Sequence, residues 1–324
     1  MTGANYSRPS LADDAGPPAT EALAVTVPAA LSGMRFDQAL AQLVPQHSRS
    51  RLKEWIDGGR VTLDGAQAEG KRRVNGGERI LVQPVLAAVA TQAVAQAMDL
   101  AIVHEDATIL VVDKPAGLVV HPGAGNRDGT LMNALLHHVP ALASVARAGI
   151  VHRLDKDTSG LMVVAKTPEA QTDLVRQLQA RTVTREYLAV ARGDLARATT
   201  VDAPIGRHPR ARTSMAVVAT GKPARTHVTP LERFGTATLV QCALETGRTH
   251  QIRVHLAAIG HPLVGDPAYG GRNSPAGFPP FARQALHAAR LALVHPRSKA
   301  LRRFEAEPPA DFAGLVLALR GRSR

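Results

Sequence analysis

The spacing of apolar residues predicts two short helices near the start of the chain. Apolar side chains recur at helical intervals from Phe36 to Leu43, and Pro45 ends the run. A second helix is expected to begin after Ser48 as its N-cap and to end at Gly58. Its inner face would bury three apolar residues: Leu52, Trp55 and Ile56.

Short apolar runs separated by turns follow these helices. Residues 61–63 and 79–82 have the composition of strands, and the Asp64-Gly65 pair favours a tight turn after the first of them. Two helices and short strands within one stretch predict a small α/β unit.

Changes in composition divide the whole chain into four segments. Residues 1–30 are rich in Ala, Pro and Thr without periodicity, and are expected to form a flexible leader. The small α/β unit covers residues 31–84, and residues 85–98, which carry little charge, are expected to be a linker. Residues 99–324 remain for a larger second domain.

The second domain mixes apolar runs of strand length with helical patterns. Strands are expected in five places: 109–112, 161–165, 183–191, 239–244 and 286–295. Helices are expected through Leu131, after Thr167-Pro168, from Thr249 to Gly260, and after Asp311.

A polar loop between Val151 and Leu161 separates two apolar runs, and the pattern predicts strand, loop, strand. Asp155 stands in this loop among basic side chains, which favour its ionised form: His152, Arg153 and Lys156. A structural ion pair with Arg153 is the commoner role of such an aspartate. The residues alone do not decide between a catalytic and a structural role for Asp155.

The charge balance indicates a polyanionic partner. The chain has 39 Lys and Arg against 27 Asp and Glu, a formal net charge of +12, which favours nucleic acid over other partners. An anionic membrane surface is the alternative, but no apolar run approaches the roughly 20 residues that span a bilayer.

The location expected from the sequence is the cytoplasm. The one cysteine, Cys242, can form no internal disulfide, as suits a reducing compartment, and the N-terminus has no secretory pattern. Aromatic residues are few, at 3%, so recognition of nucleic acid is expected to depend on backbone and shape.

The second short helix carries a compact basic surface. Arg49 and Lys53 lie four residues apart on one face, with Arg51 to one side, although a solvated charged helix is the usual meaning of this pattern. The order of elements, with a Ser-Arg-Ser-Arg-Leu helix before the Asp-Gly turn, resembles the S4 RNA-binding domain over residues 33–84.

Two segments of the second domain can supply chemistry. In the run 183–191, Tyr187 alternates away from Leu188, so it can face a cleft, or it can be an ordinary half-buried strand tyrosine. On the helix expected from Thr249, His250 and Arg253 share a face.

Residues 204–227 are rich in basic side chains and are expected to form a hairpin that grips phosphates.

Several motifs in fixed order resemble the RluA family of pseudouridine synthases. They cover residues 100 to 310 and include Lys114-Pro115-Ala116-Gly117, His121-Pro122-Gly123, His152-Arg153-Leu154-Asp155, Arg185-Glu186-Tyr187, Gly247-Arg248-Thr249-His250-Gln251-Ile252-Arg253, and Gly265-Asp266-Pro267. The resemblance implies an α+β fold: a mixed, largely antiparallel β-sheet flanked by helices and loops, preceded by the small α/β S4 domain.

The resemblance also implies roles for individual residues. Asp155 would be the catalytic nucleophile, Tyr187 would stack on the target base and help to move its C5 proton, and Arg253 would be the basic partner of Asp155. Arg153 would hold a flanking phosphate and Leu256 would lie under the base. The remaining expected contacts with RNA are His152, Arg248, His250 and Lys114, with Arg49, Arg51 and Lys53 in the S4 domain.

The expected activity is isomerisation of specific uridines in large-subunit ribosomal RNA, either free or in a pre-ribosomal particle, by a monomer without cofactor or metal. A carboxylate suits cleavage of a glycosidic bond, because positive charge develops on the sugar. Asp155 could attack C1′ or remove the 2′ proton, and the sequence does not distinguish these routes.

Two other functions were compared with this one. A non-catalytic RNA-binding or ribosome-assembly factor is the main alternative, and the presence of Asp155, Tyr187 and Arg253 argues against it. A metal hydrolase built from the 13 histidines is less consistent with the sequence, because His250 and His255 lack metal-ligand spacing with a matching acidic residue.

Overall fold

The structure is a computed structural model and describes residues 22–322, apart from 46, 48, 85–92, 124, 212–213 and 271–277. The expected cap Ser48, most of the expected leader and the first part of the expected linker lie outside these residues. The chain divides into two compact units, residues 1–88 and 89–324.

The first unit packs two helices on a four-stranded sheet. The helices α1 (Phe36–Leu43) and α2 (Arg49–Asp57) confirm the predicted pair. The sheet has the order β1 (Leu23–Thr26), β4 (Arg79–Val82), β2 (Val61–Leu63), β3 (Ala66–Gln67). Its core joins both helices to the strands through Phe36, Leu40, Leu52, Trp55 and Ile80. A turn with positive φ at Asp64 and Gly65 connects β2 to β3, as the sequence predicted.

The N-terminal strand corrects the expected extent of the leader. The sequence predicted a flexible leader over residues 1–30, whereas β1 pairs antiparallel with β4 and so belongs to the first unit. Leu23 and Val25 pack against the core of this unit. The pattern is only four residues long and lies within an Ala- and Pro-rich stretch, which is why periodicity did not reveal it.

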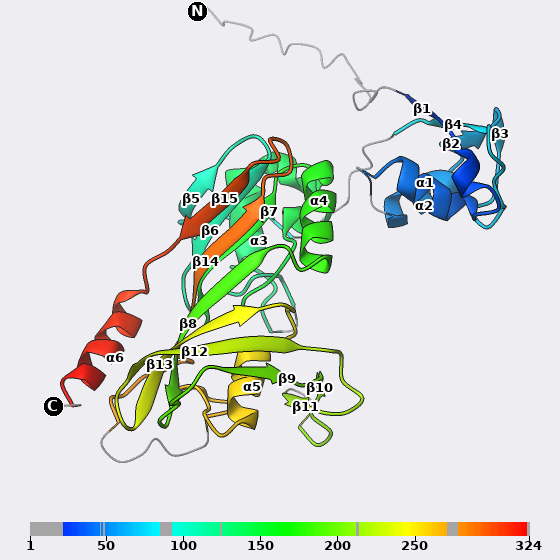
Figure 1. The fold of residues 1–324 in the computed structure, drawn as a ribbon. Helices are drawn as coiled ribbons and strands as arrows, with labels where there is room; N and C mark the ends of the chain where they lie inside the picture. The colour runs from blue at the N-terminus through cyan, green and yellow to red at the C-terminus, as the bar shows by residue number, and fades with distance from the viewer. Residues whose placement is uncertain are drawn as a thin grey trace, which may run out of the picture. The chain divides into compact units, whose positions relative to one another are not determined.

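The second unit is built on a mixed sheet of nine strands (Figure 1). β14 runs parallel to β7, and the other described pairings are antiparallel. β15 (Leu301–Glu305) pairs with β14, and a separate hairpin consists of β10 (Ile205–Arg207) and β11 (Met215–Val217). The main path runs β5 (Ala101–Glu105), β6 (Ile109–Lys114), β7 (Ser159–Ala165), β14 (Leu286–Val294), β8 (Thr184–Arg192), β13 (Ala237–Leu244), β12 (Arg225–Arg233), β9 (Thr199–Asp202).

Helices cover both faces of this sheet, because its strands alternate their apolar side chains between two layers. In β6, Leu110 and Val112 join the cluster that contains α3 (Leu131–His138) and α5 (Gln251–Ala258). Ile109 and Val111 join the opposite cluster with α4 (Pro168–Gln179), and α6 (Ala310–Arg320) packs on the far half of that face. The fold is therefore α+β with a largely antiparallel sheet, as predicted.

The segment before the polar loop differs from the prediction. Ile150 makes only an isolated bridge to Val164 in place of a strand, and residues 146–149 form a 3-10 turn. Arg147, Ala148 and Gly149 all have positive φ, at 53°, 49° and 75°. A Cβ at Gly149 would lie 1.8 Å from the Ala165 carbonyl oxygen, so the close approach of this turn to β7 requires glycine.

The start of α5 also differs from the prediction. The helix was expected from Thr249, but His250 precedes it with a left-handed backbone, φ 57°. Ile252 and Leu256 are buried, as expected, whereas Ile259 is 36% exposed and does not continue the buried stripe. His250 therefore extends from a fixed turn rather than from a helical face.

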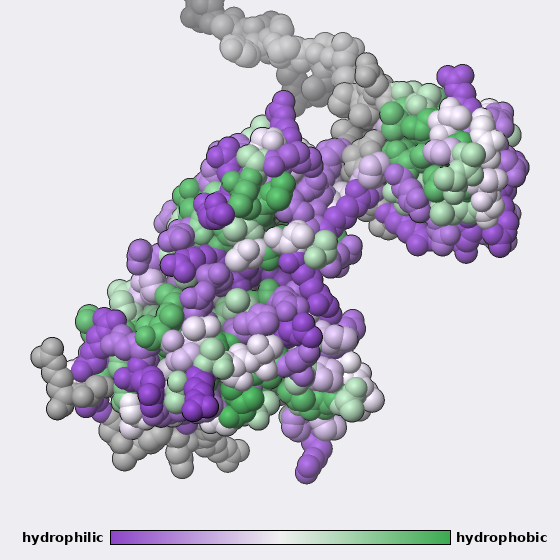
Figure 2. Space-filling view, in the orientation of Figure 1, coloured by the Kyte–Doolittle hydropathy of each residue, from purple (hydrophilic) through white to green (hydrophobic). Residues whose placement is uncertain are grey.

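Hydrophilic residues, interspersed with smaller hydrophobic patches, cover most of the face shown in Figure 2. None of the described helices is both long enough and apolar enough to cross a membrane.

Candidate active site

The Asp155 loop is anchored to the rest of the second unit on several sides. The Lys114 ammonium donates to the carbonyl oxygens of Pro115, Leu118 and Lys156, at 2.8 to 2.9 Å. Gly117 N–H also donates to the Lys156 carbonyl, and Arg283 Nη1 donates to the carbonyl of Asp157 at 3.0 Å. These bonds hold the loop in one conformation, so Asp155 extends from a rigid support.

Arg253 connects Asp155 to a second, fully buried carboxylate. Its Nη1 donates to Asp155 Oδ2 at 3.0 Å, while Nε and Nη2 donate to the two oxygens of Asp266 at 2.7 and 2.9 Å. The Asp266 side chain is 0% exposed. Burial by itself would lower the pKa of Arg253, but the hydrogen bonds and charges of Asp266 and Asp155 raise it above its ordinary value. Arg253 therefore stays a cation and orients the Asp155 carboxylate.

A second basic group faces Asp155 from the turn before α5. His250 Nε2 lies 3.8 Å from Asp155 Oδ1, and His250 Nδ1 lies 2.8 Å from the Tyr269 hydroxyl. That hydroxyl accepts the Met215 N–H at 2.9 Å, which leaves its own proton for His250 Nδ1. Burial lowers the pKa of His250, and the charge of Asp155 opposes this shift. Tyr269 also places its ring 5.1 Å from the Arg253 guanidinium.

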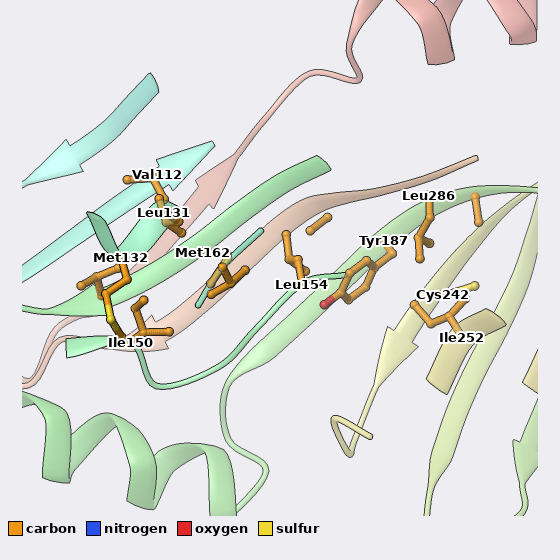
Figure 3. Packing of buried hydrophobic residues seen from close by; sticks show 14 of the residues in the cluster. Val112, Leu131, Met132, Ile150, Leu154, Met162, Tyr187, Cys242, Ile252 and Leu286 are labelled. Atoms are coloured by element: carbon orange, nitrogen blue, oxygen red, sulfur yellow. The ribbon is translucent and has the colours of Figure 1, made fainter. Parts of the chain in front are cut away.

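Tyr187 forms an apolar wall beside this carboxylate. Its ring packs among Leu154, Ile252 and Leu286 (Figure 3), and burial raises the pKa of its phenol to about 12. The hydroxyl is therefore protonated at neutral pH. Arg185 lies two residues before Tyr187 on the same strand.

One cavity of about 570 Å³ lies beside Asp155. The cavity brings together Asp155, Tyr187 and Arg253, the three residues predicted to be catalytic. It also includes four predicted contacts with RNA: His152, Arg153, Arg248 and His250.

Two predicted substrate contacts lie elsewhere. Lys114 is 1% exposed and uses its ammonium on the three carbonyls that anchor the loop, and burial lowers its pKa to about 8. Leu256 is 0% exposed in the core and does not border the cavity. The apolar side chains at the cavity are instead those that surround Tyr187. Helical spacing could not distinguish a residue under the base from a residue one layer deeper.

His152 borders the cavity, but it is not a cation. Burial, reinforced by the charge of Arg185, lowers the pKa of its ring to about 3. Its Nε2 accepts the Val163 N–H at 3.1 Å, which requires that nitrogen to be unprotonated. His152 therefore fixes the loop against β7 as a neutral ring.

The predicted basic residues of the first unit lie on α2. Arg49 pairs with Asp37 at 3.0 Å and Lys53 with Asp57 at 2.6 Å, yet their side chains remain 58% and 64% exposed. Arg51 is partly buried on the same helix. The Lys53–Asp57 pair is exposed on both sides, whereas the Asp37 side chain is only 9% exposed. An ion pair exposed on both sides contributes little to stability.

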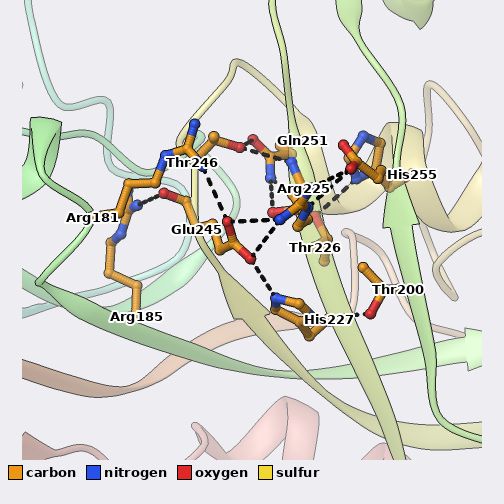
Figure 4. A network of polar contacts seen from close by, with 11 residues as sticks. Arg181, Arg185, Thr200, Arg225, Thr226, His227, Glu245, Thr246, Gln251 and His255 are labelled. Atoms are coloured by element: carbon orange, nitrogen blue, oxygen red, sulfur yellow. Dashed lines mark hydrogen bonds and ion pairs between the residues drawn. The ribbon is translucent and has the colours of Figure 1, made fainter.

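Figure 4 shows a surface network of charges, of which Arg181 and Glu245 also line the cavity. The Glu245 carboxylate contacts His227 at 2.8 Å, Arg181 at 3.2 Å and Arg225 at 3.4 Å. Arg225 also pairs with Asp202. Arg225 and His227 lie in the stretch 204–227 that was expected to grip phosphates, whereas no role was predicted for Arg181.

The residues that sequence reasoning missed are Asp266 and Tyr269. The motif Gly265-Asp266-Pro267 was recognised, but no role followed from it, because its carboxylate acts through Arg253, 13 residues away. The signal was a carboxylate in a glycine- and proline-bounded segment. In the described part of the chain, no group of three His, Cys, Asp or Glu side chains could hold a metal ion.

Comparison with known families matches both units. Residues 108–258 match the model of the RNA pseudouridylate synthase family, and residues 34–80 match the S4 domain.

Relatives match almost the entire chain. The chain is 56% identical to ribosomal large subunit pseudouridine synthase D of Nitrosomonas europaea, over 98% of this chain and 94% of the relative. It is 53% identical to the protein of that name from Pseudomonas aeruginosa, over 92% and 95%. Among solved structures, human RNA pseudouridylate synthase domain containing 1 aligns with a TM-score of 0.53 and 29% identity, over 68% of this chain and 95% of the human chain.

Proposed function

Because the chain belongs to the RNA pseudouridylate synthase family, we propose that it isomerises uridines of large-subunit ribosomal RNA to pseudouridine. The observation that carries the proposal is the Asp155 carboxylate, held 3.0 Å from Arg253 in a cavity with Tyr187 as its wall. The high identity to proteins named for this activity supports the substrate class.

The reaction breaks the bond between N1 and C1′ and joins C1′ to C5 of the same base. Asp155 acts at the sugar, either by attacking C1′ or by removing the 2′ proton, while the bonding electrons leave with N1. Arg253 orients the carboxylate for this step. Tyr187 stacks on the detached base as it turns, and its hydroxyl helps to move the C5 proton after the new bond forms.

Positive charge brings the RNA to this site. The target uridine has to leave its stack, at a cost of a few kcal/mol, and contacts with phosphates offset this cost. Arg153 and Arg248 at the cavity contribute such contacts, and so do the basic residues of α2. Binding should therefore weaken as salt concentration rises.

The proposal assigns RNA binding to residues 31–84, extended by β1, and catalysis to residues 99–324. We further propose that the protein is a monomer, that it acts on ribosomal RNA in the cytoplasm, and that it needs no cofactor. Light scattering on the purified protein tests the monomer.

The decisive experiment maps pseudouridines in ribosomal RNA from a strain that lacks this protein. We expect specific large-subunit sites to lose the modification, and a plasmid with the wild-type chain to restore them. A plasmid with Asp155→Asn should not restore them. An unchanged map in the deleted strain would contradict the proposal and favour an assembly factor without catalytic activity.

A further inference from the structure

Arg185 is a buried cation with no carboxylate partner. It is 8% exposed, its Nε has no hydrogen-bond partner, and its Nη2 reaches only the Glu245 carbonyl at 3.5 Å, the limit of a hydrogen bond. The other two buried arginines of the described residues each hold a carboxylate through two bonds: Arg253 with Asp266 and Arg283 with Asp311.

The carboxylate of Glu245, whose backbone oxygen Arg185 reaches, is committed to other groups. Glu245 directs its side chain to Arg181, Arg225 and His227 and gives Arg185 only its backbone oxygen (Figure 4). Burial of an uncompensated charge destabilises a fold. Packing alone therefore gives no reason for an arginine at this position.

The fold directs this guanidinium to the cavity. Arg185 and Tyr187 lie on the same face of β8, two residues apart, and both line the cavity. A Cβ at residue 247 would lie 2.7 Å from Arg185 Nη1. The absence of a side chain at Gly247 thus leaves the space that the guanidinium occupies.

We propose that Arg185 binds the uracil base after the N1 to C1′ bond breaks, with its free N–H groups donating to the base anion. This inference rests on the proposed function. The bond breaks with both electrons on N1, and the negative charge spreads to O2 and O4 of the ring. Arg185 stabilises that charge until C5 bonds to C1′, which neutralises the base. The C5 proton then leaves and N1 takes up a proton, so the base finishes neutral. A fixed cation in a site shielded from water is well suited to a charge that develops during the reaction.

The depth of Arg185 favours the base over a phosphate as its ligand. Arg147, Arg153 and Arg181 line the same cavity but are exposed, where the RNA backbone would run. Arg185 is buried beside the tyrosine on which the base stacks. A phosphate ligand is the competing assignment, and the following experiment distinguishes the two.

The test is Arg185→Met, with rates measured in a single turnover at saturating enzyme and RNA affinity measured separately. We expect the rate to fall by about 100-fold or more, the dissociation constant to stay within about threefold, and the melting temperature to stay the same or rise, because a buried charge is removed. The matched control is Arg303→Met, which removes an exposed arginine from β15 and should leave the rate unchanged.

A second variant moves the guanidinium without removing its charge. Gly247→Ala places a methyl group against Arg185 Nη1 and should lower the rate by a smaller factor than Arg185→Met, again at constant affinity. Added guanidinium ion should partly restore the rate of Arg185→Ala and not affect the control.

Three results would overturn the inference. A weaker dissociation constant with an unchanged rate would assign Arg185 to a phosphate. A lower melting temperature of Arg185→Met would assign it to the fold, and this measurement does not depend on turnover. An undiminished rate with undiminished affinity would leave Arg185 without a role in the reaction. Inactivity of the wild type on ribosomal RNA would instead contradict the proposed function itself.

Discussion

Two groups of charged side chains, each with two members that line the cavity, combine carboxylates with basic side chains. Asp266, Arg253 and Asp155 form a buried line in which each guanidinium nitrogen contacts one carboxylate. Glu245 and its basic partners Arg181, Arg225 and His227 form the surface network, in which one carboxylate is shared by three groups.

The two groups differ mainly in how far their side chains are exposed to solvent. The side chains of Arg253 and Asp266 are 7% and 0% exposed, whereas those of Arg225 and His227 are 42% and 45% exposed. Water can replace a lost partner at the surface, but nothing replaces it in the interior. The buried line should therefore determine the geometry of the site, and the surface network should contribute little to it.

The end of the buried line gives the largest expected effect. Asp155→Asn keeps the size of the side chain but removes the nucleophilic charge, so turnover should fall by more than about 1000-fold. RNA affinity should persist, because the phosphate contacts remain. The measurement is pseudouridine formation in a ribosomal RNA transcript, with binding followed by filter retention. Residual turnover near that of the wild type would remove Asp155 from its central role.

The other end of the line, at Asp266, gives a smaller effect on turnover, which should appear in kcat and not in KM. Asp266→Asn weakens the hold on Arg253 without touching the substrate, so kcat should fall by about 10- to 100-fold with KM nearly constant. Asp266→Ala should in addition destabilise the fold by about 3–5 kcal/mol, because it removes two of the three carboxylate bonds of a buried guanidinium. The control is Glu232→Gln, whose carboxylate binds Arg320 at the surface. An equal loss of kcat or of stability in this control would show that the buried and the surface ion pairs do not differ in their effect.

The interior beside the cavity can also be tested through pH, at His152. His152, whose folded pKa is about 3, stays neutral in the fold and takes up a proton on unfolding, once the pH is below about 6.5. Its contribution to stability is therefore complete above about pH 6.5 and declines by about 1.4 kcal/mol per pH unit toward pH 3.

Urea unfolding at several pH values measures this effect. His152→Gln, which can still accept the Val163 N–H, should reduce the loss of stability between pH 6.5 and 5 relative to the wild type. Parallel pH dependences for His152→Gln and the wild type would contradict the assignment of a buried neutral ring.

The surface network gives the smallest expected effect. Glu245→Gln keeps a hydrogen-bond acceptor and removes one negative charge beside the cavity, so RNA should bind about twofold more tightly. Turnover should change less than binding does. Competition binding at low salt measures the change in RNA affinity. A large loss of turnover would show that Glu245, like the buried line, determines the geometry of the site.

Local pattern explains what the sequence could predict. Periodic apolar residues gave the helices α1, α2 and α4, whose burial depends on neighbours three and four residues away. The ordered motifs gave Asp155, Tyr187 and Arg253, and the cavity brings them together.

What escaped prediction depends on contacts between distant segments. Asp155 and Arg253 are 98 residues apart, and nothing in the spacing reveals that Asp266 also holds Arg253. The strand β1 is too short to have a period, and the left-handed turn at Arg147 follows from its close approach to β7. The isolation of Arg185 is likewise invisible in a sequence, because it concerns what is missing around a side chain in space.

The position of β14 has a consequence for timing during synthesis. β14 lies between β7 and β8 and bonds to both, although it follows them by more than 90 residues. The ribosome adds about 5–20 residues per second. Asp155 is therefore synthesised on the order of ten seconds before β14 can pair with β7 and β8. The first unit, residues 1–88, is complete long before then. On the proposed function, a growing chain can hold RNA well before it can modify it, and activity begins only near the end of synthesis.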